Sequence, residues 1–244
     1  MLGIPSETQT AARQLRERGH VLVRGAFPAD TINVICREVA RFFSDFEARM
    51  AAAQVSEVDR GLYETFGNLT FDRMVESGFG GVAALFPAIR ASKLAPVIAA
   101  HFGEAIHVPR NHVLGRYYQP PYGNVVPYHQ DVTVIDPRAS VTTWIPLNEC
   151  GAAAPGLELA NALITAPLPI TPGDYTITAD VIEWDSIRPV FKPGDAVLFL
   201  NTTPHRSYVT PDMTRPRYSF EVRYMPASAI NERDDAANLV DVTP

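Results

Sequence analysis

The chain has 244 residues, of which 46% are hydrophobic and 20% are charged, with a formal net charge of −6 and a pI of about 5.5. This length suits one domain with a sizeable core, so residues 1–244 are expected to form a single domain. The acidic balance and the lack of a basic run argue against nucleic acid or an anionic membrane as the main partner.

Two further features of the composition bear on location. Cys36 and Cys150 are the only cysteines, which make neither a disulfide framework nor a zinc site and so favour a reducing compartment. The N-terminus has no signal-peptide pattern, and no apolar run approaches the roughly 18 residues of a membrane span. A soluble, cytoplasmic protein is expected.

The first hundred residues have mainly helical patterning. Residues 32–50 carry apolar side chains at every third or fourth position, which predicts a long amphipathic helix packed on the core, with Asp30 as its N-cap. The other elements expected here are a helix over 8–18 ended by Gly19, a short strand over 20–24 and a helix over 92–102.

Two stretches are irregular. Residues 56–81 are polar and punctuated by glycine, with a short helix expected near 70–76, and residues 165–190 are rich in Pro, Thr and Asp without a clear period. Long loops inside compact domains are usually functional or disordered. One or both stretches are therefore expected to cover the mouth of the core and to choose the substrate.

From residue 104 the pattern changes to strands. These are expected over residues 105–108, 111–118, 140–147, 156–163, 196–200 and 218–225. Helices followed by many short strands predict a mainly β protein, in which a β-barrel core at about 104–226 is buttressed by helical support at about 6–103. The polar tail, 231–244, is expected to fray.

The run Tyr128-His129-Gln130-Asp131-Val132 places two metal-capable side chains two residues apart on a predicted strand, where they would share a face. His205 follows the strand over 196–200. His129, Asp131 and His205 together are the two-histidine, one-carboxylate set that leaves open positions on a non-haem Fe(II). Zinc is the chemical alternative, but no His-Glu-x-x-His helix supplies the base of a zinc hydrolase.

Arg217 and Ser219 occur at the start of the last predicted strand. A guanidinium binds a carboxylate through two parallel hydrogen bonds and stays charged when buried, as the far carboxylate of a 2-oxoacid requires. Ser219 shares the strand face of Arg217 and could donate to the same carboxylate. Arg215 and Arg223 share this face too, so alternation alone does not choose among the three arginines.

Taken in order, these motifs resemble the phytanoyl-CoA dioxygenase-like branch of the Fe(II)/2-oxoglutarate-dependent oxygenases. The resemblance covers most of the chain and starts at residues 17–27, which are similar to the family's entry strand. The remaining segments that carry it are His129-Gln130-Asp131, Trp144-Ile145-Pro146-Leu147, Gly156-Leu157-Glu158-Leu159, Pro193-Gly194-Asp195, His205-x-Ser207 and Arg217.

The resemblance implies a double-stranded β-helix, also called a cupin-like jelly roll, with the metal triad at one open end. It implies Fe(II), O₂ and 2-oxoglutarate as cosubstrate, anchored by Arg217. A Trp and a Ser near the positions of Trp144 and Ser207 contact the cosubstrate in that family, so both are expected to bind it. Asn111, on the strand ahead of the metal loop, is expected to reach the ketoacid end. The family's pattern does not involve His101, His107 and His112, which are expected to be structural or exposed.

The expected activity is oxidation, most simply hydroxylation, of a C–H bond in a small organic molecule. Desaturation, cyclisation and epimerisation use the same triad and stay open; halogenation is disfavoured because Asp131 is present. Residues 160–163 read Ala-Asn-Ala-Leu where the family often has Pro-Gly-Ser-His, so an acyl-CoA substrate is not carried over. The alternative from another class is a non-catalytic jelly-roll binding protein.

Overall fold

The computed structural model describes residues 6–120, 125–182, 184–232 and 234–244. Within them the strands form two antiparallel sheets. The larger sheet has the order β1 (His20–Val23), β8 (Ala196–Leu200), β5 (Val141–Pro146), β10 (Arg217–Pro226), β3 (Ile106–Pro109) and β11 (Leu239–Asp241), with β4 (Val113–Tyr118) pairing β10 and β2 (Asn68–Thr70) pairing β4. The smaller sheet has the order β7 (Ser186–Ile187), β6 (Gly156–Ala160) and β9 (His205–Tyr208).

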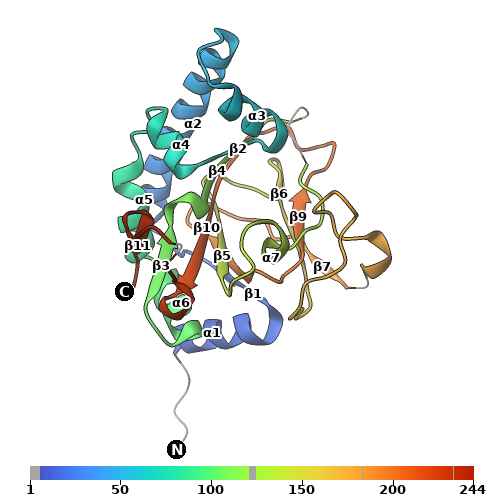
Figure 1. Ribbon diagram of the computed structural model, residues 1–244. Helices are drawn as coiled ribbons and strands as arrows, with labels where there is room; N and C mark the ends of the chain where they lie inside the picture. The colour runs from blue at the N-terminus through green and yellow to red at the C-terminus, as the bar shows by residue number, and fades with distance from the viewer. Residues whose placement is uncertain (1–5, 121–124, 183, 233) are drawn as a thin grey trace, which may run out of the picture.

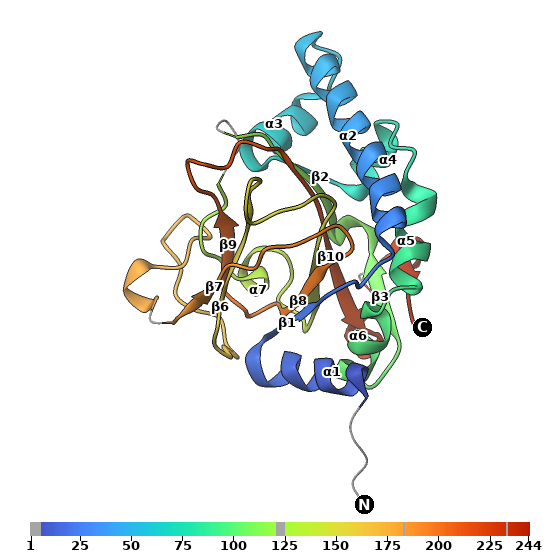
Figure 2. The same ribbon diagram turned by 180° about the vertical axis from the view of Figure 1, so that it is seen from behind.

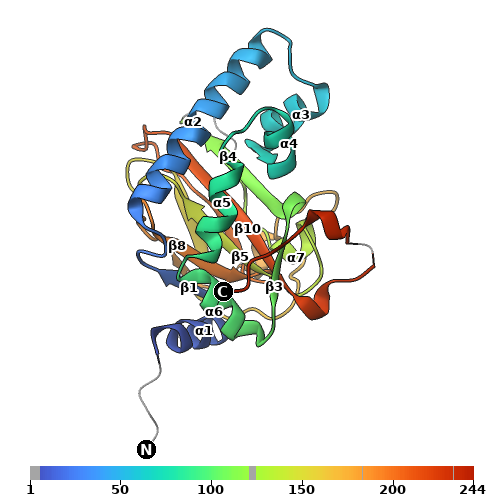
Figure 3. The ribbon, with the colours of Figure 1, turned by 90° about the vertical axis from the view of Figure 1, so that its left-hand side faces the viewer.

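The two sheets lie face to face, and the helices cover the outer face of the larger one (Figures 1 and 2). This is the expected jelly-roll core with helical support, although the larger sheet does not close on itself. Figure 3 shows α2 (Ala29–Ala51) and α5 (Val82–Arg90) lying across β4, β10 and β5. Helices α1 (Glu7–Arg18) and α6 (Leu94–Phe102) pack together at one end of this sheet.

The apolar stripe of α2 forms part of the main hydrophobic core, as the sequence predicts. Phe42, Phe43 and Phe46 are buried, and the ring of Phe43 stacks on Tyr117 of β4 at 5.6 Å between centroids. Burying an aromatic side chain of this size contributes about 2–3 kcal/mol. The stripe thus holds α2 on the sheet that carries the site described below.

The N-terminal half contains more regular structure than the sequence suggested. Residues 56–81, expected to be a loop with one short helix, form α3 (Glu57–Phe66), β2 and α4 (Phe71–Glu76). Ser56 caps α3 by accepting a hydrogen bond from the N–H of Asp59, a start signal that the polar composition obscured. Helix α5, which contains Pro87, was not expected from the sequence. Asp30 was expected to be the N-cap of α2, but it lies in the first turn of that helix, and Pro28 is the N-cap residue.

The C-terminal tail was expected to fray, but it pairs and packs against the rest of the protein. Strand β11 pairs with β3, and the side chain of Val242 is fully buried. Arg138 bridges Asp136 and Asp234 with nitrogen–oxygen distances of 2.6 Å to each carboxylate. The polar composition of the tail concealed these few pairing and packing contacts.

No helix in the described part of the chain has both the length and the apolar character that crossing a membrane requires.

The turn before β8 is held by the carboxylate of Asp195. It accepts hydrogen bonds of 3.0 Å from the main-chain N–H groups of Gly25 and Lys192 and pairs with Arg24 at 2.7 Å. Burial alone would raise the pKa of Asp195, but these donors outweigh it and hold the pKa below its usual value. The carboxylate therefore fastens the end of β1 to the start of β8.

We expect Asp195→Asn to lower the free energy of unfolding at pH 7 by about 1–3 kcal/mol, because two main-chain N–H donors and Arg24 lose a charged acceptor. The folded-state pKa is depressed, so this contribution is complete above the unfolded pKa of about 4, begins to decline below it, and is lost as the pH falls through the lower folded-state pKa. Urea unfolding at pH 7 and pH 3.5 measures the change, with exposed Asp45→Asn as control. An equal loss at both pH values would contradict a role for the charge.

Candidate functional site

Three buried side chains from two distant segments of the chain, residues 129–131 and His205, converge between the two sheets. His129 and His205 exchange main-chain hydrogen bonds of 3.1 Å, which brings the two imidazoles together. Asp131 Oδ1 lies 4.0 Å from Nε2 of each histidine. The three ligand atoms are all within 4.8 Å of one another, so this set could hold a metal ion.

Main-chain carbonyls orient both imidazoles. His129 Nδ1 lies 2.9 Å from the oxygen of Pro127, and His205 Nδ1 lies 3.0 Å from the oxygen of Thr203. A carbonyl only accepts hydrogen bonds, so each Nδ1 carries the proton and each Nε2 presents a lone pair. Burial, with the neighbouring His205, lowers the pKa of His129 to about 3, which keeps this imidazole neutral.

Asp131 is held in place by Arg223 and Thr142. Arg223 donates from Nε to Oδ2 and from Nη2 to Oδ1, both at 3.0 Å, and the hydroxyl of Thr142 donates to Oδ2 at 2.5 Å. Burial would raise the pKa of Asp131, but Arg223 and the histidines outweigh it and keep the carboxylate ionised. With Oδ2 engaged by two donors, Oδ1 is the oxygen that faces the histidines.

The local backbone differs from the expected strand. The extended segment ends at Gln130, and Asp131 begins the short helix α7 (Asp131–Val134). Strand alternation is therefore the wrong explanation for why His129 and Asp131 meet. The turn into α7 brings the carboxylate back towards the histidines, while the side chain of Gln130 points elsewhere.

Arg217 is buried in the interior, where it lines the same small cavity as His129 and His205. Its guanidinium carbon lies 5.5 Å from the ring centroid of Tyr118 and 6.0 Å from that of Trp144, and Nη1 donates to the oxygen of Gly156 at 3.2 Å. Within the described residues, Arg217 Nε and the hydroxyl of Ser219 are buried without a hydrogen-bond partner. Burial, with the nearby Arg116, lowers the pKa of Arg217, as expected for a cation that lacks a bound anion.

The other two candidate arginines are placed differently. Arg215 is exposed ahead of β10, and Arg223 is committed to Asp131. Sequence reasoning missed this role of Arg223, because its position shares the parity of Arg217. Thr142 was also missed, since a threonine on a strand carries no distinguishing signal.

A narrow cavity joins Arg217 to the histidines. Its volume is about 10 Å³, roughly what one water molecule needs. Residues expected to bind cosubstrate contribute to its wall: Trp144, Ser207 and Arg217. Arg116 lies on the same wall and pairs with Glu221 of β10.

A wider cavity of about 360 Å³ is lined by His129 and Asp131. Asn111 lines this cavity, next to His112, which the sequence had suggested would be structural or exposed. Both irregular stretches reach it as expected, residues 56–81 through Leu62, Asn68 and Thr70, and residues 165–190 through Tyr175. Leu114, Val126, Val134 and Ile135 provide apolar wall.

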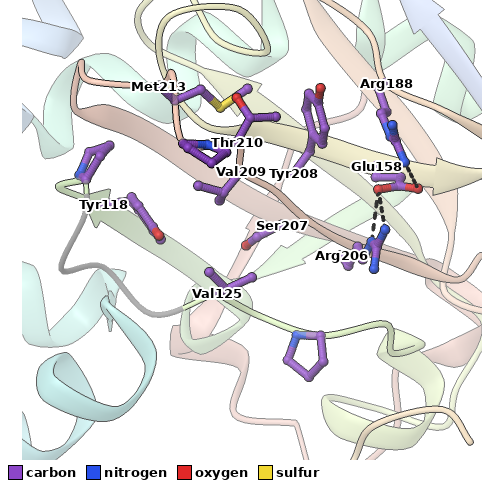
Figure 4. A pocket seen from close by; sticks show the side chains of 13 residues that line it. Tyr118, Val125, Glu158, Arg188, Arg206, Ser207, Tyr208, Val209, Thr210 and Met213 are labelled. Carbon is purple, nitrogen blue, oxygen red and sulfur yellow. Dashed lines mark hydrogen bonds and ion pairs between the residues drawn. The ribbon is translucent and has the colours of Figure 1, made fainter. Parts of the chain in front are cut away.

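A third cavity of about 800 Å³ lies along β9 and the loop that follows it (Figure 4). Glu158 stands at its edge between Arg188 and Arg206, at 3.2 and 2.9 Å. Burial would raise the pKa of Glu158, but Ser186 and these arginines lower it to about 2. None of the three metal-capable residues lines this cavity. We therefore regard the two cavities that include His129 as the candidate active site.

Comparisons with known proteins identify a family whose model matches this chain and solved structures that share its fold. The family model described as Phytanoyl-CoA dioxygenase (PhyH) matches residues 15–215. No sequence among the curated proteins matches the chain. The family match ends two residues before Arg217, so the position of that side chain is an observation of the structure alone.

Several solved structures share the fold. The epimerase SnoN in complex with Fe3+, alpha ketoglutarate and nogalamycin RO has a TM-score of 0.64 and 15% identity, over 92% of this chain and 85% of that chain. EctD from S. alaskensis with 2-oxoglutarate and 5-hydroxyectoine has a TM-score of 0.64 and 15% identity, over 94% and 78%. The non-heme alpha ketoglutarate dependent carbocyclase SnoK from nogalamycin biosynthesis has a TM-score of 0.59 and 15% identity, over 92% and 88%.

We expect Asp131→Ala to destabilise the metal-free protein by about 3–5 kcal/mol, because it leaves the buried guanidinium of Arg223 without its main partner. His129→Ala should destabilise the metal-free protein less, because no buried charge loses its partner. Both variants should lose tight metal binding. Urea unfolding in EDTA measures the first effect, and calorimetric titration with Zn(II) measures the second. Equal stability of the two variants would show that the Asp131–Arg223 pair does not stabilise the apo site.

Proposed function

The chain belongs to the phytanoyl-CoA dioxygenase family, and on this basis we propose that it is an Fe(II)- and 2-oxoglutarate-dependent oxygenase. His129, Asp131 and His205 would hold the metal. Arg217 would bind the far carboxylate of 2-oxoglutarate. The substrate would be a small organic molecule bound in the wider cavity.

The observation that supports this proposal best is the state of Arg217. Among the residues that the structure describes, neither Arg217 Nε nor the hydroxyl of Ser219 has a hydrogen-bond partner. A buried guanidinium in this state is costly unless an anion joins it, and Ser219 is a second buried donor on the same strand face. The narrow cavity connects this guanidinium to both histidines. A dicarboxylate that satisfies Arg217 at one end would therefore reach the metal position at the other.

The donor set also suits the metal. Two imidazoles whose Nδ1 atoms are engaged by main-chain carbonyls and one carboxylate oxygen would occupy one side of an ion and leave the other side open, as non-haem Fe(II) oxygenases require. Asp131 Oδ2 accepts two hydrogen bonds, from Arg223 and Thr142, whereas Oδ1 accepts only one, from Arg223, which favours metal binding through Oδ1 alone. Single-oxygen binding keeps a further position free for cosubstrate or O₂.

Bound Fe(II) with 2-oxoglutarate and O₂ supplies an oxidant that removes hydrogen from a C–H bond, with release of succinate and CO₂. The protein's own residues position the reactants and exclude water. Arg217, Ser219 and Ser207 orient the cosubstrate, and Trp144 packs beside it. Because the space beside Arg217 is only about 10 Å³, we expect wall side chains to move when a five-carbon diacid binds.

The wider cavity indicates what kind of molecule reaches the metal. Each charged side chain of its wall has a partner: Arg116 pairs with Glu221 of β10, and Arg223 pairs with Asp131. The rest of the wall combines aliphatic groups with the neutral side chains of Asn68, Thr70 and Asn111. We infer a substrate with little net charge, an apolar body and hydroxyl or carbonyl groups. The simplest reaction on such a substrate is hydroxylation. Desaturation, cyclisation and epimerisation would use the same residues.

We expect the Fe(II)-loaded protein to release succinate from 2-oxoglutarate under air with ascorbate, even without substrate. Arg217→Met should raise the apparent cosubstrate KM about 30-fold or more, because truncating one partner of a desolvated, charged pair costs about 2–5 kcal/mol. Arg217→Lys should recover part of the loss, since an ammonium lacks the planar fork.

Exposed Arg215→Met is the matched control and should keep the wild-type KM. A large KM effect in Arg215→Met with none in Arg217→Met would refute the anchor. His129→Ala, Asp131→Ala and His205→Ala should each abolish succinate release. Wild-type turnover in any of the three would remove that residue from the triad.

A further inference from the structure

Gln130, between the two metal-capable residues of its segment, is fully buried and uses its whole amide group for contacts with distant chain. Nε2 donates to the oxygens of Ala166 and Thr202, at 3.1 and 2.5 Å. Oε1 accepts from the N–H of Leu168 at 2.7 Å. One side chain thus ties the metal segment to the turn before His205 and to the irregular stretch after β6.

The stretch beyond Leu168 forms a hairpin over residues 169–178. Its legs are joined by main-chain hydrogen bonds between Thr178 and Pro169 at 3.1 Å and between Thr171 and Thr176 at 2.8 Å. Most of the hairpin is exposed, and Ile177 is its one buried side chain. A segment with so few buried contacts opens easily on its own, so its position depends on how its base is fastened.

Both legs of the hairpin are fastened to neighbouring residues of the metal segment. Gln130 holds the first leg at Leu168, and the oxygen of Tyr128 accepts from the N–H of Ile177 on the second leg at 2.8 Å. Between these two attachments, the ring of Tyr175 meets that of His129 nearly at right angles, with 5.8 Å between centroids. Tyr175 forms part of the wall of the wider cavity.

We propose that Gln130 is a positioning residue that fastens the 169–178 hairpin over the metal centre, so that metal binding and closure of the substrate cavity are coupled. A metal bound by His129 and Asp131 restrains the backbone on both sides of Gln130. The side chain of Gln130 passes this restraint to Leu168 and so holds Tyr175 in the cavity wall. Coupling of this kind is reciprocal, so a fastened hairpin also strengthens metal binding. The coupling rests on the proposed metal centre, whereas the fastening does not.

Hydrogen–deuterium exchange of metal-free protein tests the fastening. Gln130→Met keeps the length of the side chain but removes all three hydrogen bonds, and it should speed exchange in residues 164–178 about tenfold or more. Exposed Gln54→Met, in the connection between α2 and α3, is the matched control and should behave as wild type. Wild-type exchange of residues 164–178 in Gln130→Met would overturn the proposal.

Exchange in the presence of Zn(II), which binds without turnover, tests the coupling. In wild type, Zn(II) should slow exchange of residues 164–178 about threefold or more. In Gln130→Met, Zn(II) should still protect peptides that contain His129 and His205, but it should leave residues 164–178 unchanged. A purely structural glutamine would not alter this response, so an equal response to Zn(II) in both proteins would overturn the coupling.

Two further comparisons keep the outcomes distinct. If exchange in β5 and β10 shows that Gln130→Met does not fold, Gln130→Asn serves instead, because it keeps the amide but is too short to span the same contacts. If wild type fails to bind Zn(II), the metal centre of the proposed function is rejected, and with it the coupling. The metal-free comparison still decides the fastening.

Discussion

The architecture of the site depends on one requirement, that the buried carboxylate of Asp131 must be neutralised. An isolated carboxylate in a protein interior is too costly to remain ionised, and here Arg223 and Thr142 provide the compensation. These partners come from β10 and β5, two neighbouring strands of the larger sheet. The register of that pair therefore fixes where the carboxylate lies, and with it where a metal can bind.

Strand β10 carries the two cations of the site on one face. Arg223, towards its end, supports the metal-capable carboxylate of Asp131, and Arg217, at its start, lacks an anionic partner among the described residues. Alternation puts Ser219 and Glu221 between them on the same face. Because Glu221 pairs with Arg116 and contacts Arg223, the only buried guanidinium of this row left for an incoming anion is that of Arg217. In the proposed function, the positions of metal and cosubstrate would thus both follow from one strand.

The sequence predicted the chemistry of the site better than its geometry. The residue types and order of His129, Asp131, His205 and Arg217 were readable, as was a β core with helices before it. Asp131 was wrongly predicted to lie on a strand. The extended segment ends at Gln130, and a helix as short as α7 leaves no periodic pattern in the sequence. The role of Arg223 could not be found, since parity is shared by three arginines. Gln130 makes long-range contacts with a segment that has no periodic pattern, so no local rule identifies them.

The most direct test of the account is calorimetric titration of 2-oxoglutarate into anaerobic protein, with and without Mn(II). If one dicarboxylate spans the metal and Arg217, its affinity in the presence of Mn(II) should be at least about tenfold higher than without metal, because chelation adds to the ion pair. Equal affinity with and without Mn(II) would contradict a shared site, and no binding in either state would contradict the proposed cosubstrate.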